Sequence, residues 1–146
     1  MRKDSEIISY VEAANNVLGE IGYTEHGMAH VVKTGEDASR ILKALGYGER
    51  ECELAKIAGL MHDIGNMINR CDHAQSGAFL AFELLRARNF PVDEVIKITT
   101  AIGHHDEKTA APVTPLRRHS FLRIRAMYAP RESATKTPCT MTSTTE

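Results

Sequence analysis

Residues 49–66 read ERECELAKIAGLMHDIGN, and this stretch decides the fold. It is rich in Glu, Ala, Leu and Lys, and its apolar residues recur every three or four positions. This pattern predicts an amphipathic helix over about 49–63 with one buried face. Gly65 then permits a sharp exit from the helix. The predicted helix therefore carries two polar side chains, His62 and Asp63, at its carboxyl end.

Four further stretches on either side show the same spacing of apolar residues. They predict helices over about 5–21, 24–45, 73–88 and 92–103, with Asp4 or Ser5 capping the first and Thr24 the second. Neither an alternating strand pattern nor an internal repeat is evident. The expected fold class is all-α, a bundle of about five to six helices.

The length of 146 residues suits one domain. Lys and Arg number 18 against 19 Asp and Glu, so no basic field exists to hold nucleic acid or a membrane surface. No apolar run approaches the roughly 20 residues that span a bilayer, and the start MRKDSEIISY lacks the apolar core of a secretory signal. Three cysteines at unrelated spacings do not suggest a disulfide scaffold. We therefore expect a cytoplasmic protein.

The composition changes after about residue 115. Eight of the sixteen residues from 131 to 146 are Ser or Thr, and Met141 is the only large apolar one. Such a segment cannot bury enough apolar area to offset the entropy lost on ordering. We expect one domain over residues 1–115, with its core motifs at 26–106, and an atypical, disordered tail over 116–146.

The histidines form an informative pattern, because six of the seven precede residue 106 and fall at predicted helix ends or on shared faces. Imidazole nitrogens and carboxylate oxygens are the ligands that Mn, Fe, Co, Ni and Zn select. Each histidine taken alone is more often a solvated or hydrogen-bonded side chain. The joint pattern favours a centre for one or two ions inside a helical bundle. Its members are His26 and His30, four residues apart on one helix face, then His62-Asp63, His73 and His104-His105.

This ordered set resembles the HD-domain superfamily of metal-dependent phosphohydrolases. Residues 59–66, GLMHDIGN, are similar to the central motif of that family, an apolar helix that ends in LHDIG. His30 resembles the upstream histidine, and His73 with Gly77 is similar to the HPxxG element of the two-metal branch. His104-His105 resembles the HHE element of the same branch. The resemblance covers about residues 20–115.

The resemblance implies a ligand set for one or two divalent transition metals (Mn, Fe, Co, Ni or Zn). His30, His62 and Asp63 would hold one ion. Asp63 would bridge to a second ion held by His73 and by His104 or His105. Two ions about 3.5–4 Å apart hold a bridging water, lower its pKa and stabilise both oxygens of a phosphoryl displacement.

The implied activity is hydrolysis of a phosphomonoester or phosphodiester, with a nucleotide as the expected substrate and His62 and Asp63 at the catalytic centre. His26 would bind metal or a substrate phosphate, and Arg70 would attract that phosphate. The expected partner is a small phosphorylated molecule rather than a membrane or nucleic acid. The oligomeric state stays open.

The chain departs from the family pattern in two places. Asn66 stands where several members have Lys, and no Asp follows Asp106, although the family pattern ends with a distal Asp. Permitted codons for residues 118–127, read one base out of frame, give Ala-Leu-Ile-Leu-Ala-Asp-Lys-Gly-Asp, which resembles the missing family helix. We therefore hypothesise a frame change near Leu116, or a truncated carboxyl end.

Two other functions are consistent with the sequence. The first is an impaired module that lacks the distal Asp and only binds metal or nucleotide. The second is a di-iron oxygenase, because some members with this fold use the same ligand set for oxygen chemistry. Bound metal without product release would indicate the first, and iron with oxygen uptake the second.

Overall fold

The computed structural model describes residues 1–23 and 27–106 of the chain. These residues form five α-helices and one short 3-10 helix, and no strand occurs among them. The prediction of an all-α fold is therefore confirmed. The elements are α1 (Ser5–Glu20), α2 (Met28–Ala44), α3 (Glu49–Met61), η1 (Ile64–Met67), α4 (His73–Ala87) and α5 (Val92–Gly103).

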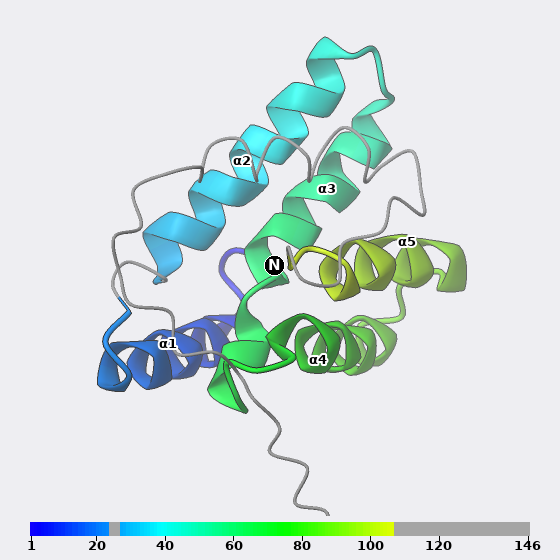
Figure 1. Cartoon of the computed structure of the whole chain (residues 1–146). Coiled ribbons are helices and arrows are strands. Elements are labelled where there is room, and N and C mark those ends of the chain that lie inside the picture. The colour runs from blue at the N-terminus through cyan, green and yellow to red at the C-terminus, as the bar shows by residue number, and fades with distance from the viewer. Residues whose placement is uncertain (24–26, 107–146) are drawn as a thin grey trace, which may run out of the picture.

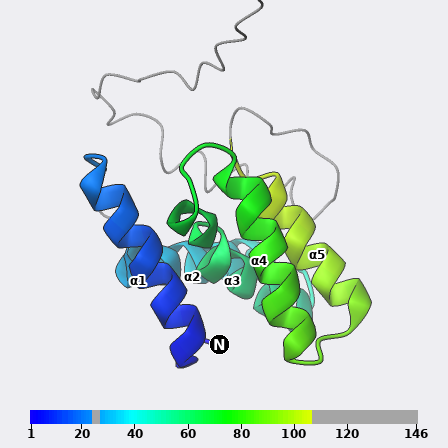
Figure 2. The same cartoon turned by 90° about the horizontal axis from the view of Figure 1, so that it is seen from below.

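The helices lie in two layers. Helices α2 and α3 form an antiparallel pair (Figure 1), and they lie behind the layer of α1, α4 and α5 when the molecule is seen from below (Figure 2). The short η1 turn packs against both α1 and α4. Aliphatic side chains from every element form one core between the layers, among them Ile7, Val31, Leu54, Met61, Ile64, Leu85, Ile98 and Ile102.

Two glycines allow the backbones of α2 and α3 to come into direct contact. A Cβ atom on Gly59 would lie 2.6 Å from the Cα of Gly35, and one on Gly35 would lie 2.6 Å from the carbonyl oxygen of Lys56. No side chain fits at either position. Because the two helices run antiparallel, this contact brings the first turn of α2 to the carboxyl end of α3.

The helix starts agree with the sequence in part. Asp4 caps α1 as predicted, since its Oδ1 atom accepts hydrogen bonds from the backbone N–H groups of Glu6 and Ile7 at 3.1 and 3.4 Å. Helix α2 begins at Met28 with Gly27 as its N-cap, later than the predicted start at Thr24. Thr24 itself lies outside the described residues.

The predicted disordered tail over 116–146 also lies outside the described residues, as does the predicted domain boundary at 115. Within the described part of the chain, every helix is too short or too polar to cross a lipid bilayer.

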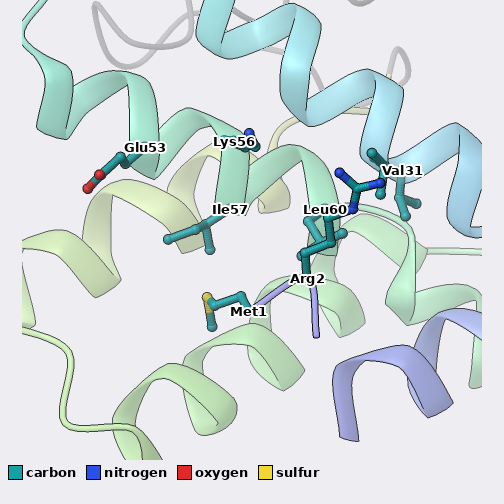
Figure 3. Close-up of a pocket in the computed structure, with 8 residues that line it drawn as sticks. Met1, Arg2, Val31, Glu53, Lys56, Ile57 and Leu60 are labelled. Atoms are coloured by element: carbon teal, nitrogen blue, oxygen red, sulfur yellow. The ribbon is translucent and has the colours of Figure 1, made fainter. Parts of the chain in front are cut away.

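An apolar groove of about 240 Å³ lies between the amino terminus, α2 and α3 (Figure 3). Its walls come from Met1, Arg2, Val31, Val32, Glu53, Lys56, Ile57 and Leu60. No histidine lines this groove. It is therefore separate from the polar cluster formed by His62, Asp63 and the side chains around them.

Candidate metal centre

Five side chains from four helices converge where the two layers meet. His30 comes from the first turn of α2, His62 and Asp63 follow α3, His73 begins α4, and His105 follows α5. The side chains of His62, Asp63 and His73 are buried, and those of His30 and His105 are only about a tenth exposed. The centre is therefore largely closed to bulk water.

The carboxylate of Asp63 divides the cluster into two halves. Its Oδ2 atom lies 3.4 Å from His30 Nε2 and 3.1 Å from His62 Nε2, which define the first half-site. Its Oδ1 atom lies 3.6 Å from His73 Nε2 and 3.8 Å from His105 Nε2, which define the second half-site. Within each half-site the potential ligand atoms lie within 4.8 Å of one another.

Backbone carbonyls fix the tautomers of three rings. The Nδ1 atoms of His62, His73 and His105 lie 2.8, 3.1 and 2.7 Å from the carbonyl oxygens of the residues three positions earlier. A carbonyl only accepts, so each Nδ1 must carry the hydrogen and donate it. The Nε2 atom of each neutral ring then presents a lone pair to the centre, as in metal-ligating histidines with an oriented outer nitrogen.

The spacing of the four Nε2 atoms suits metal ions. His30 and His62 have their Nε2 atoms 3.4 Å apart, and His73 and His105 have theirs 3.0 Å apart. Two ligands that each lie about 2.1 Å from one ion are separated by roughly 3.0–3.4 Å. Without a cation, the unprotonated Nε2 atoms of His73 and His105 repel each other at this distance. The donor set therefore fits one ion in each half-site.

The charge states agree with this arrangement. Burial alone would raise the pKa of Asp63, but the surrounding imidazoles of His62, His105 and His30 outweigh it and hold that pKa well below its usual value. Burial, followed by the neighbouring His105 and Arg70, lowers the pKa of His73 to about 4. Asp63 is therefore ionised and His73 is neutral near pH 7, the forms in which both bind metal.

Asn66 contacts the central carboxylate, a placement that the sequence interpretation missed. It is fully buried, and its Nδ2 atom donates to the carbonyl oxygen of Asp63 at 2.9 Å and to Asp63 Oδ1 at 3.0 Å. The sequence suggested only the loss of a Lys contact. The structure instead gives Asn66 the role of orienting the central carboxylate, a role set by the η1 turn that follows Asp63 directly.

Arg70 lies beside the second half-site. Its Nη1 atom is 3.3 Å from Asn66 Oδ1 and 3.3 Å from His73 Nε2, and its guanidinium carbon lies 5.1 Å from the centre of the Tyr23 ring. The structure therefore brings this cationic side chain within hydrogen-bond distance of His73. Its proposed contact with a substrate phosphate stays a prediction.

His104 does not join the cluster. The structure brings His105 rather than His104 to Asp63, and His104 belongs to neither half-site. Within the described residues, the buried Nδ1 atom of His104 has no hydrogen-bond partner. His26 lies outside the described residues, so its predicted role is untested.

One family model and three curated relatives match the chain. The family model described as HD domain matches residues 27–136. The chain is 22% identical over 120 residues to an uncharacterized protein of Methanocaldococcus jannaschii, a match that covers 70% of this chain and 46% of that protein. It is 32% identical over 85 residues to Ribonuclease Y of Opitutus terrae, over 58% of this chain and 15% of the relative.

A third relative is Ribonuclease Y 2 of Levilactobacillus brevis, 28% identical over 94 residues, with 64% of this chain and 16% of that protein covered. The chain thus spans less than half the length of each of these curated relatives. A comparison with solved structures found no match.

Proposed function

Since the chain belongs to the HD-domain family, we propose that it is a metal-dependent phosphohydrolase that cleaves a phosphate ester with water as the nucleophile. The single observation that carries the proposal is the convergence of four imidazole Nε2 atoms on the two oxygens of one buried carboxylate. The cofactor would be one or two divalent ions from the set Mn, Fe, Co, Ni and Zn.

Bound in the two half-sites, such ions would supply a nucleophilic water at neutral pH and Lewis-acid stabilisation of the phosphoryl oxygens. Asp63 would contribute one oxygen to each half-site and so set the separation between them. Asn66 holds that carboxylate by its Oδ1 atom. His62, His73 and His105 are held by their backbone carbonyls, so these rings need little reorientation on binding.

The substrate is proposed as a small phosphorylated molecule, with a nucleotide as the leading candidate. Two relatives carry the name Ribonuclease Y, which favours a phosphodiester over a monoester. The net charge of −1 favours a nucleotide over a long nucleic acid, because it provides no extended cationic surface. The cytoplasm is the proposed location.

Elemental analysis and a generic assay test the proposal together. The purified protein should contain Mn, Fe, Co, Ni or Zn, and should release nitrophenol from bis(p-nitrophenyl) phosphate faster than from p-nitrophenyl phosphate. Asp63→Asn should lose both metal and activity. Asp93→Asn is the matched control, because Asp93 is an exposed residue in the first turn of α5.

The absence of any Asp after Asp106 favours a second candidate, a module that binds metal without turnover. Metal retained by wild type with no product from either ester would support the module over the hydrolase. Protein without bound metal, even after incubation with Mn²⁺, would contradict both the hydrolase and the metal-binding module. Sequencing the gene across the codons for residues 116–127 would test the frame-change hypothesis directly.

A further inference from the structure

We propose that Arg70 acts as an internal cation beside the second half-site, so that the two half-sites bind metal with unequal affinity. The inference rests on the proposed metal centre and adds to it an order of loading: the first half-site fills readily, and the second fills only when Arg70 withdraws. Two features of the structure support this inference. Arg70 contacts both ring nitrogens of His73, and it lies apart from the first half-site.

Arg70 contacts both nitrogens of one ring. Its carbonyl oxygen accepts from His73 Nδ1 at 3.1 Å, and its guanidinium Nη1 lies 3.3 Å from His73 Nε2. The first contact fixes the hydrogen on Nδ1, so Nε2 holds a lone pair. A guanidinium has donors only and stays charged. It therefore donates to the lone pair that a metal ion in the second half-site requires.

One lone pair cannot serve both the guanidinium and a metal ion. An ion bound by Asp63 Oδ1, His73 and His105 would also meet a fixed positive charge within a few ångströms. Binding there requires Arg70 to move, and this requirement weakens the apparent affinity. The first half-site carries no such cost, because the described hydrogen bonds of Arg70 reach Asn66 and His73 but neither His30 nor His62.

Two further contacts hold Arg70 in this position. Asn66 Oδ1 accepts from its Nη1 atom, and the Tyr23 ring lies against its guanidinium in cation–π geometry. The Asn66 contact also orients the amide so that Nδ2 faces Asp63. Arg70, Asn66 and Asp63 thus form a chain of hydrogen bonds that is complete before any metal arrives.

The test is a Mn²⁺ titration of metal-free, full-length protein by isothermal calorimetry, with free Mn²⁺ counted by electron paramagnetic resonance. Wild type should show one tight and one weak site. Arg70→Gln removes the charge and should tighten the weak site by about tenfold or more, since a positive charge a few ångströms from the bound ion repels it strongly at intermediate dielectric. Arg70→Met should act in the same direction.

Arg86→Gln is the matched control, because it makes the same charge change in the last turn of α4, and it should leave both affinities unchanged. Two sites of equal affinity in wild type, or a weak site that neither Arg70 variant tightens, would contradict the role of Arg70. Neither result would contradict the proposed metal centre. No Mn²⁺ binding to wild type would overturn both. Circular dichroism establishes that each variant is folded.

Discussion

Replacing Gly59 by Ala is the sharpest test of how the fold builds the centre. A Cβ atom at this position would lie 2.6 Å from the Cα and 2.7 Å from the backbone nitrogen of Gly35, whereas ordinary contact begins at 3.4 Å. Helices α2 and α3 must therefore separate by about 0.8 Å, the difference between 3.4 and 2.6 Å. Both clashing atoms are backbone, so no side-chain rotation relieves the contact.

The expected cost follows from two opposed effects. Overpacking of this kind costs typically 1–3 kcal/mol, and we expect about 3 because the contacts are with backbone. The higher helix propensity of Ala returns about 1 kcal/mol. The free energy of unfolding should therefore fall by about 2 kcal/mol, as measured by urea denaturation without metal.

The same shift should impair the first half-site. Gly59 lies one turn before His62, and Gly35 lies about one turn after His30, so separating the helices moves the two ligands apart. Metal sites tolerate ligand displacements of only about 0.2 Å. The first-site dissociation constant for Mn²⁺ should rise at least tenfold, by calorimetry.

Gly19→Ala provides the matched control. A Cβ atom at Gly19 of α1 meets nothing within 4 Å. The substitution should therefore stabilise the protein by about 0.5–1 kcal/mol through helix propensity, with metal affinity unchanged. If Gly59→Ala proved as stable as wild type and bound Mn²⁺ equally well, the backbone contact would not be what brings the ligands together.

Three further predictions concern the cluster and the helix cap. Asn66→Leu leaves the Asp63 carbonyl and Oδ1 without their amide donor, so the free energy of unfolding should fall by about 1–3 kcal/mol in urea; an unchanged midpoint would refute the role of Asn66. The Arg88 hydrogen bond lowers the pKa of Asp4 to about 2. The ionised Asp4 carboxylate therefore stabilises the folded protein above the unfolded pKa of about 3.9, and this stabilisation is lost as pH falls toward 2. Thermal melts from pH 6 to pH 2 should show the advantage of wild type over Asp4→Asn shrinking below about pH 4, and a constant advantage would contradict this linkage. Mn²⁺ at one hundred times its dissociation constant should raise the free energy of unfolding by about 2.7 kcal/mol, and EDTA should abolish the gain; a midpoint insensitive to both would exclude a metal bound only by the folded state.

The helices could be predicted from the sequence because their signals are local. Apolar spacing and the Asp4 cap are properties of a few neighbouring residues, and both appear in the structure as predicted. The η1 turn was not predicted, because four residues of 3-10 helix carry no periodic pattern. Phe79 and Phe82 are large apolar residues of α4, yet they are 67% and 41% exposed, since Ala81, Leu84 and Leu85 fill the core face instead.

The candidate ligands could be named in advance, but the choice among them depended on packing. His104 and His105 are adjacent, so the sequence alone could not say which one faces Asp63. The packing of the carboxyl end of α5 against the bundle brings His105 to Asp63. The role of Asn66 was equally hidden, because it depends on the η1 turn placing the amide three residues after Asp63 directly against that carboxylate.

One local rule links the fold to the chemistry of the centre. His62 and His105 each follow a helix directly or by one residue, and each donates Nδ1–H to a carbonyl in the last turn, three residues earlier. Carbonyls at helix ends are available to such partners. His73 makes the same contact across Asp72, whose φ of 57° lies in the left-handed region that Asp tolerates. In all three cases the backbone contact that completes the local structure also fixes the tautomer, so the lone pairs of the centre follow from how its helices end and begin.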